Sequence, residues 1–553
     1  MLNAVTEAGV LHSSENLSNY SAIYTKINVG HLNLKLDTVI PSDRSCWQKA
    51  SEEAKINYKY VLAQKLSKFQ PTNCSACTNL HCNTENHLNE IDEYTLNILE
   101  AIEDAGQECL PKSGAMKTKN KKKQNKIYGW SEHVKPYLDE HKFWYELWIS
   151  AGKPPTGDLF MNMKQSKTQY KFATRRLKRC QDKIQNEQLA SSLLQSSGGN
   201  FFKEIRKIRG KVQTCSTKID NIVGSEDIAN HFGEIYKNLY NNVDHGYEFD
   251  RMQEEIEHKV NIDSEFQVQR VTVPVVRDAL KQLKANKKDS IFDASSDLYL
   301  NGPPELVQHL TSLIKLYLVH GYVTPTVLLC TLLPLVKDGL GDLTLSKNYR
   351  AIAGGCLLLK VIDLVILSLE KDKLNFDCMQ FAYQVKSSTS MCTWTVTAVI
   401  DHFNRNGLNV FGAAMDMTKA FDMVEWCELF KSLSERNIDA VFLRLVLFIY
   451  CNQQCAAKWC GRYSSWFSVK NGVRQGGVSS GIFFAIYIDN LLSLLRKAKI
   501  GCHINGIFYG AMVFADDIFL LSPSRNGLQV MVNLCHEFVS RKNLKFGTDV
   551  NPS

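Results

Sequence analysis

The chain has 553 residues, of which 44% are apolar and 22% charged, and a formal net charge of +8. This composition is typical of a globular protein of about three or four domains and excludes a disordered or low-complexity chain. The longest apolar stretches, 327–336 and 357–369, are too short or too interrupted by charge to span a membrane. Because the start lacks a signal-peptide pattern, the 17 cysteines are expected to be free thiols or metal ligands.

Residues 1–45 carry few helix signals, and 21–29 alternate in polarity as a strand does. Residues 46–110 are predicted to be helical, apart from one interruption that is rich in cysteine and histidine. Its C-x₂-C-x₄-C-x₄-H spacing suits one tetrahedral zinc ion. The ligands would be Cys74, Cys77, Cys82 and His87, with His81 as a competing ligand. A cysteine-rich turn without metal is the alternative.

Two basic stretches follow. Residues 111–129 are predicted to be a basic linker, which contains the lysine run 117–126. Residues 130–260 are predicted to be mostly helical and basic, and within them 164–187 form a basic helix interleaved with aromatic residues. Each stretch is either a solvated surface or a contact with a nucleic-acid backbone, and a nuclear import receptor is a further partner for the linker.

Acidic residues follow predicted strands at two places. In the stretch 410–424 an apolar strand is predicted to end at Asp416, and a helical pattern follows. Asp516 and Asp517 lie between two apolar runs, which predicts a strand, a tight turn and a second strand. A carboxylate at a strand end beside a hairpin with two more is an arrangement that holds two magnesium ions about 3.5–4 Å apart. The alternatives are a helix N-cap for Asp416 and a solvated turn for the pair.

A glycine-rich motif lies between the two acidic elements. It runs from Asn471 to Ser480 with adjacent glycines, and an apolar helical segment, 481–497, follows. Glycines before a helix allow the backbone to approach a ligand closely, and a helix N-terminus favours anions. The position of this motif between the acidic elements favours a nucleotide site.

The three motifs together resemble the reverse transcriptase of non-LTR (LINE-type) retrotransposons. They are Asp-x-x-Lys-Ala-Phe-Asp from Asp416, Asn-Gly-Val-Arg-Gln-Gly-Gly from Asn471 and Phe-Ala-Asp-Asp from Phe514, in the family's order. Three upstream segments resemble the fingers of that family: 332–338, 348–352 and 380–384. The resemblance covers roughly residues 270–553.

The resemblance implies an RNA-directed DNA polymerase that uses Mg²⁺, deoxynucleoside triphosphates, an RNA template and a DNA primer, with no membrane partner. Its catalytic and metal-binding residues would be Asp416, Asp516 and Asp517. Its nucleotide-binding residues would be Lys337 and Arg350 at the triphosphate, Phe421 as the steric gate under the sugar, and Gln475 and Gly476 beside the nucleotide. The alternative roles are a core side chain for Phe421, a turn residue for Gln475 and surface cations for Lys337 and Arg350.

The expected fold is α/β in the broad sense (α+β), a right-hand polymerase palm and fingers with an antiparallel palm sheet after a mostly α-helical extension. The expected domains are a remnant of an endonuclease C-terminal strand (1–45), a helical segment with the Cys/His cluster (46–110), the basic linker (111–129), a helical basic region (130–260), the fingers (261–400) and the palm (401–553).

The sequence departs from the family pattern at four places, of which the mildest is Phe514 in place of the more common tyrosine. Gly481 stands where the family usually has proline, Ser18-Asn19-Tyr20 replaces a Ser-Asp-His triplet of the endonuclease, and no thumb motif follows residue 547. We therefore expect a chain that does not cut DNA, binds RNA and extends primers poorly.

The alternative functions are those of an intron maturase, an RNA-dependent RNA polymerase and a decayed, non-catalytic fragment that binds RNA. The family implies a location in cytoplasm and nucleus.

Overall fold

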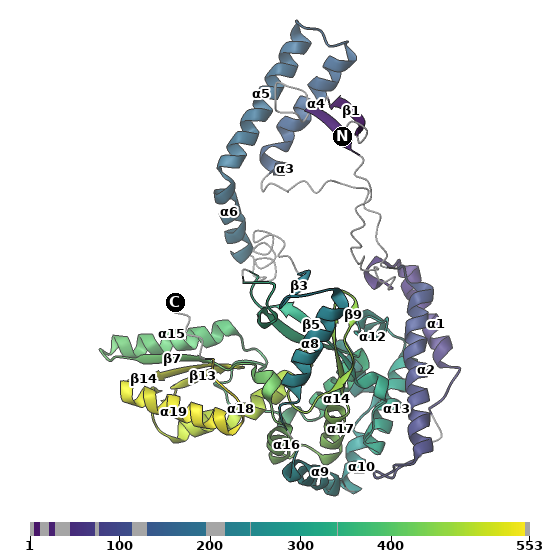
Figure 1. The fold of residues 1–553 in the computed structure, drawn as a ribbon, viewed down its shortest axis with the longest axis vertical. Helices are drawn as coiled ribbons and strands as arrows, with labels where there is room; N and C mark the ends of the chain where they lie inside the picture. Colours follow the sequence, from purple (N-terminus) through teal and green to yellow (C-terminus); the bar gives the residue numbers. More distant parts are fainter. Residues whose placement is uncertain are drawn as a thin grey trace. The chain divides into compact units, whose positions relative to one another are not determined.

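The fold is described from a computed structural model of the chain (Figure 1). The described residues are 5–11, 22–27, 45–71, 77–112, 130–194, 216–243, 245–260, 262–339 and 341–547. The predicted basic linker lies almost wholly outside them, as does Cys74. The chain divides into two compact units, Met1–Ile40 with Ala115–Gln213 and Pro41–Gly114 with Thr214–Ser553. The domain boundaries expected from the sequence stay predictions.

The first unit combines a hairpin with a small helical group. The hairpin pairs β1 (Val5–Leu11) with β2 (Ala22–Ile27) in antiparallel register. The helices are α3 (Trp130–His133), α4 (Lys135–Ser150), α5 (Asp158–Arg179) and α6 (Gln181–Leu194). The core of this group holds Tyr170, one of the aromatic residues interleaved with the basic residues of 164–187, whereas Phe172 is 66% exposed.

The second unit begins with two long helices, α1 (Glu52–Leu66) and α2 (Glu85–Cys109). The Ser51 side chain caps α1 by accepting a hydrogen bond from the Ala54 amide. Both helices pack against each other and against α13 (Pro304–His320), so their apolar faces join the main core. The helices predicted over 46–110 are therefore present, with the cysteine-rich interruption between them.

A mixed sheet forms the centre of the second unit. Its path is β10 (Phe467–Ser468), β8 (Gln454–Trp459), β5 (Leu329–Val336) and β6 (Tyr349–Gly355), and β9 (Arg462–Tyr463) pairs with β8. β5 and β6 run antiparallel, whereas β5 and β8 run parallel. Short strands β3 (Lys218–Ile219) and β4 (Ile222–Val223) precede α8 (Ser225–Tyr240), which packs on β8.

Further helices surround this sheet. They are α9 (Tyr247–Lys259), α10 (Ile262–Gln269), α11 (Val273–Lys281), α12 (Ser296–Leu300), α14 (Leu357–Leu369), α16 (Trp426–Glu435) and α17 (Ala440–Cys451). None of the helices within the described ranges is both long and apolar enough to cross a membrane.

The predicted antiparallel palm sheet is confirmed. Its order is β13 (Ala511–Phe514), β14 (Asp517–Ser522) and β7 (Phe411–Asp416), with every pair antiparallel. α15 (Thr389–Arg405) contacts β13, and α19 (Arg525–Arg541) contacts β14 and β7 (Figure 1). α18 (Ser480–Lys497) packs against α19 and so supports the sheet. A two-stranded ribbon of β11 (His503–Ile504) and β12 (Ile507–Phe508) precedes β13.

Candidate active site

The palm sheet brings the three predicted acidic residues to one end. β7 ends at Asp416, and Asp517 begins β14 directly opposite it in the strand register. Asp516 lies in the turn between β13 and β14. The helix-cap alternative for Asp416 is wrong, because α16 begins ten residues further along and Glu425 occupies its N-cap.

The three carboxyl groups act on one another electrostatically. Burial raises the pKa of Asp516, and the charges of Asp517 and Asp416 raise it further, whereas Arg350 lowers it. Burial also raises the pKa of Asp517, and Asp416 adds to that effect. Like charges held this close favour a bound cation, and carboxylate oxygens are the ligands that Mg²⁺ prefers. The donor set at this end of the sheet therefore fits magnesium.

Gln380 holds the acidic turn, a role that sequence reasoning missed. Ala515 adopts a left-handed backbone conformation with φ of 58°. The Gln380 side-chain oxygen accepts hydrogen bonds from the amides of Ala515 (3.0 Å) and Ala382 (3.1 Å), and the residue is 1% exposed. Phe381 adds a backbone bond to the Val513 carbonyl at 2.8 Å. These bonds fix the turn that presents Asp516.

Cations gather beside the acidic end of the sheet. Burial lowers the pKa of Lys337, and the positive charges of Lys419 and Arg350 lower it further. Lys337 directly follows β5, where its amide donates to the Asn348 carbonyl at 2.8 Å, and Arg350 lies opposite Leu335 in the paired strand β6. The positive charge of Arg350 also lowers the pKa of Asp516. The predicted pair Lys337 and Arg350 is therefore brought together. Lys419 joins them from the Asp416 motif, where sequence reasoning gave it no role.

Phe421 lies in an aromatic group beside the glycine-rich motif. It belongs to a short 3₁₀ turn, Ala420–Met423, and is half-buried. Its ring stacks on Phe484 of α18, with centroids 4.5 Å apart and planes at 18°. Tyr383 meets the ring edge-on at 6.5 Å. Phe421 is therefore packed between two aromatic rings and only partly exposed, and both the steric-gate and the core interpretations remain predictions.

The predicted residues Gln475 and Gly476 pack against β6. The Gln475 carbonyl accepts a hydrogen bond from the Ala353 amide at 2.8 Å, and a Cβ at Gly476, whose φ is 109°, would meet the Ala353 carbonyl oxygen at 3.1 Å. The Gln475 side chain donates to Asp422 at 3.0 Å. Gly476 is therefore required both by its backbone conformation and by this close approach.

Asp422 is a buried acid that sequence reasoning gave no role. It is 5% exposed and accepts hydrogen bonds from the Tyr240 hydroxyl at 2.6 Å and from Gln475 at 3.0 Å. Burial raises its pKa to about 6, against the opposing effect of the Tyr240 hydrogen bond. Tyr240 is the last residue of α8, so this bond connects α8 to the 3₁₀ turn that contains Asp422 and Phe421.

The raised pKa of Asp422 predicts a pH dependence of stability. Between its unfolded value of 3.8 and its folded value of about 6, the folded state holds a proton that the unfolded state lacks. The free energy of unfolding should therefore rise as the pH falls through this window, by up to about 3 kcal/mol. We expect Asp422→Asn, which keeps an oxygen acceptor, to lose this contribution. Denaturant unfolding of both proteins at several pH values measures it, and parallel pH curves would contradict the assignment.

The structure explains the glycine that replaces the family's proline. A Cβ on Gly481 would meet ring atoms of Tyr383. Tyr383 is itself held in a left-handed conformation, with φ of 62°. A residue larger than glycine at 481 would displace this ring from its place beside Phe421.

We therefore predict that Gly481→Ala destabilises the chain by about 1–3 kcal/mol, because overpacking forces Tyr383 to move. Gly355→Ala is the matched control, since a Cβ there meets no atom within 4 Å. Urea unfolding of the two variants measures the difference. Equal stabilities would show that the Tyr383 ring moves without cost.

The predicted zinc ligands are brought together only in part. Cys77, Cys82 and His87 lie in one cluster, which His320 of α13 completes. The competing ligand His81 lies instead at 2.8 Å from Glu257. The histidine at 320 is separated from the motif by more than two hundred residues, so no local spacing could have indicated it.

Comparison with known proteins places this site in a recognised domain. Residues 337–549 match the family model described as "Reverse transcriptase (RNA-dependent DNA polymerase)". The chain is 25% identical over 203 residues to a Pol polyprotein from the type-2 retrotransposable element R2DM of Drosophila melanogaster, which covers 37% of this chain and 19% of the relative. It is 23% identical over 261 residues to the Pol polyprotein of the element R2 of Nasonia vitripennis, with 47% and 25% covered.

A third relative is an uncharacterised 149 kDa protein of the transposon TX1 from Xenopus laevis, 24% identical over 344 residues that cover 59% of this chain and 25% of the relative. Among solved structures, apo telomerase from Candida tropicalis is similar with a TM-score of 0.30 and 15% identity, over 42% of this chain and 52% of that chain. The chain spans at most a quarter of the length of these curated relatives. Residues 337–549 are therefore a reverse transcriptase domain of the non-LTR retrotransposon type, as the resemblance of the motifs predicted.

Proposed function

We propose that the chain is an RNA-directed DNA polymerase whose nucleotidyl transfer takes place at Asp416, Asp516 and Asp517. The observation that carries this proposal is the strand register, which sets Asp517 opposite Asp416 with Asp516 in the adjoining turn. All three aspartates lie within the segment that matches the reverse transcriptase family model. A solvated turn would need neither the register nor the buried Gln380 clamp.

The carboxylates and the cations of the site would have different roles in this reaction. Asp416, Asp516 and Asp517 supply the oxygen ligands for magnesium. When bound, magnesium would lower the pKa of the primer 3′-hydroxyl and offset the charge that develops on the leaving pyrophosphate. The positive charges beside these carboxylates would bind and orient the triphosphate. These cations are Lys337, Arg350 and Lys419.

Three further residues would position the nucleotide. Gln475 and Gly476 hold the glycine-rich loop against β6, where the missing side chain at 476 makes room for the Ala353 carbonyl oxygen. Phe421, supported by Phe484, would lie under the sugar and exclude a 2′-hydroxyl. This assignment favours deoxynucleotides over ribonucleotides as substrates.

The proposed partners are an RNA template and a DNA primer. Exposed basic side chains on α5 would contact the phosphate backbone, and such contacts weaken steeply with salt. They are Lys164, Arg175, Arg176, Lys178 and Arg179. A solvated helix surface is the alternative, and a salt titration of binding to an RNA–DNA hybrid distinguishes the two.

Single-turnover primer extension tests the proposed function. With the 553-residue chain in excess over a DNA primer annealed to RNA, rebinding does not limit the measurement. We expect Mg²⁺-dependent addition of the deoxynucleotide that the template specifies. A chain that binds the hybrid but adds nothing would support the decayed-fragment alternative. Preferential addition of ribonucleotides would support an RNA polymerase instead.

A further inference from the structure

Two distant segments meet in a cluster of cysteine and histidine side chains. Cys77 and Cys82 come from the connection between α1 and α2, and His87 lies in the first turn of α2. His320 is the last residue of α13. One ligand atom from each of the four residues lies within 4.8 Å of all the others. The cluster lies within the second compact unit and outside the polymerase motifs.

Two of the separations within the cluster match those of a tetrahedral zinc site. Zinc lies about 2.0–2.1 Å from histidine nitrogen and about 2.3 Å from cysteine sulfur, which in a tetrahedron places neighbouring ligand atoms about 3.3–3.8 Å apart. The Cys82 Sγ lies 3.3 Å from His87 Nδ1. His87 Nδ1 lies 3.4 Å from His320 Nε2. Both cysteines are free thiols, so the sulfur atoms remain available as ligands.

The orientation of His320 is fixed from the opposite side of its ring. Its Nδ1 lies 3.0 Å from the Leu316 carbonyl oxygen, one turn earlier in α13. A carbonyl only accepts, so Nδ1 donates its hydrogen and Nε2 presents its lone pair to the cluster. A metal-binding histidine commonly donates its other ring N–H to a carbonyl or carboxylate in this way. His320 is only 5% exposed, so the ring is also held by its surroundings.

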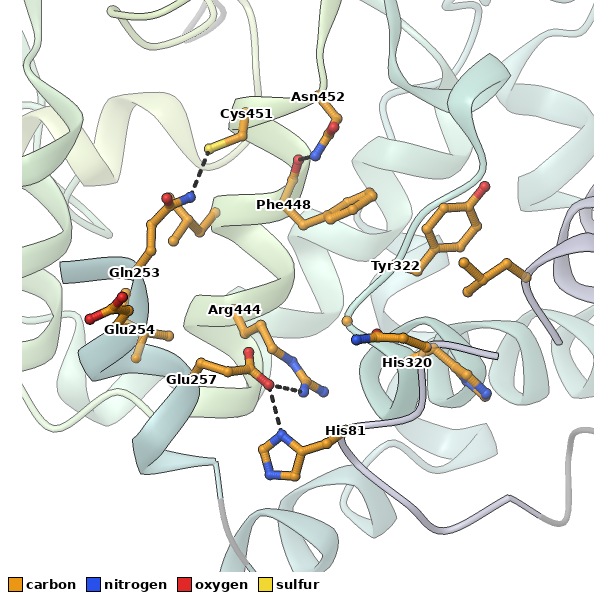
Figure 2. Close-up of a pocket in the computed structure, with 15 residues that line it drawn as sticks. His81, Gln253, Glu254, Glu257, His320, Tyr322, Arg444, Phe448, Cys451 and Asn452 are labelled. Atoms are coloured by element: carbon orange, nitrogen blue, oxygen red, sulfur yellow. Dashed lines mark hydrogen bonds and ion pairs between the residues drawn. The ribbon is translucent and has the colours of Figure 1, made fainter. Parts of the chain in front are cut away.

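Arg444 of α17 braces both segments that supply the ligands. Its guanidinium donates to the Leu80 carbonyl within the cysteine-containing connection. It also donates to the carbonyls of Leu318 (2.7 Å) and Val319 (3.1 Å) at the end of α13. The two segments are therefore fastened together next to the cluster, independently of any metal. Figure 2 shows Arg444 between α9 and the end of α13, close to His320.

We propose that Cys77, Cys82, His87 and His320 bind one structural Zn²⁺. Four protein ligands leave no open coordination position, which is the mark of a structural site. Binding would release the two thiol protons to solvent, as the thiolate is the ligand. The ion would fasten the α1–α2 connection to α13, and thus the helical extension to the core of the second unit.

This ligand set differs from the one that the sequence spacing suggests. His81 is turned toward Glu257, with its Nδ1 2.8 Å from the carboxylate, and Glu257 also pairs with Arg444 (Figure 2). His320 takes the fourth position, so Cys74 is not needed to complete the tetrahedron. The two ligand sets make opposite predictions for Cys74 and His320.

The test is the zinc content of the purified full chain, measured by mass spectrometry after dialysis. We expect one Zn²⁺ per chain in the unsubstituted protein and in Cys74→Ser and His81→Gln. Loss of zinc is expected in Cys82→Ser and His320→Gln. His309→Gln is the matched control, because His309 lies on the same helix and is held by a hydrogen bond with the Tyr94 hydroxyl at 2.7 Å. It should keep its zinc.

A second readout identifies the ligand types without relying on a variant that loses the metal. Cobalt(II) in a site of two thiolates and two imidazoles gives a tetrahedral visible spectrum with sulfur charge-transfer bands. Co²⁺ exchanged into the intact chain should give this spectrum, and Cys74→Ser should leave it unchanged. Retention of zinc in His320→Gln with loss in Cys74→Ser would overturn the proposal in favour of the sequence-derived set. Absence of zinc and of the cobalt spectrum from the intact chain would also overturn it.

Discussion

Asp516→Asn is expected to slow the addition of a templated deoxynucleotide by about a thousandfold or more. The substitution keeps the size of the side chain but removes a negative oxygen ligand from the acidic end of the palm sheet. The same substitution should raise the thermal melting temperature. Burial and the neighbouring charges of Asp517 and Asp416 raise the pKa of Asp516, so its ionised form destabilises the fold at neutral pH.

The measurement pairs single-turnover kinetics with thermal unfolding of the same preparations. Glu537→Gln is the control, because Glu537 is an exposed carboxylate on α19 of the same domain. It should change neither rate nor melting temperature appreciably. A variant Asp516→Asn that extends primers at the original rate would remove this residue from the catalytic group. A variant that unfolds at lower temperature would show that Asp516 has a structural role instead.

Phe421→Val is expected to lower the preference for deoxynucleotides over ribonucleotides by roughly tenfold to a hundredfold. The ring rests on Phe484 at 4.5 Å and meets Tyr383 edge-on, so its position is well defined. Valine would leave room where the ring stands, and a 2′-hydroxyl would then be tolerated. The ratio of kcat/KM for a matched pair of deoxy- and ribonucleotides measures the change.

Phe538→Val serves as the control for this experiment. Phe538 is also half-buried, but it lies on α19, beside Lys542. Both variants should lose some stability, whereas only Phe421→Val should change sugar selection. An unchanged ratio in Phe421→Val would return Phe421 to a purely structural role in the core.

The elements that position the carboxylates were predictable from local patterns. The apolar run before Asp416 predicts β7, and the two runs around Asp516 predict the β13–β14 hairpin. Strand alternation and turn residues act over a few positions, so they are visible in the sequence. The family resemblance then orders these elements into a palm, and the sheet confirms this order.

The contacts that hold the site together were not predictable. Gln380 reaches the Ala515 amide across 135 residues, and Tyr240 reaches Asp422 across 182. His320 meets His87 across 233 residues. Such pairs depend on how whole helices and strands pack, which leaves no periodic trace in the chain. For the same reason β8 pairs with β5 although the two lie on opposite sides of the predicted boundary between fingers and palm.

Double substitution tests whether the acidic residues of the palm form one catalytic site. Single-turnover addition rates would be compared for Asp416→Asn, Asp516→Asn and the variant with both changes. Residues that act as a unit have effects that do not multiply, so the double variant should be within about threefold of the slower single variant. Effects that multiply would show that Asp416 and Asp516 act independently. An Asp416→Asn variant that adds nucleotides at the original rate would show that Asp416 lies outside the catalytic site.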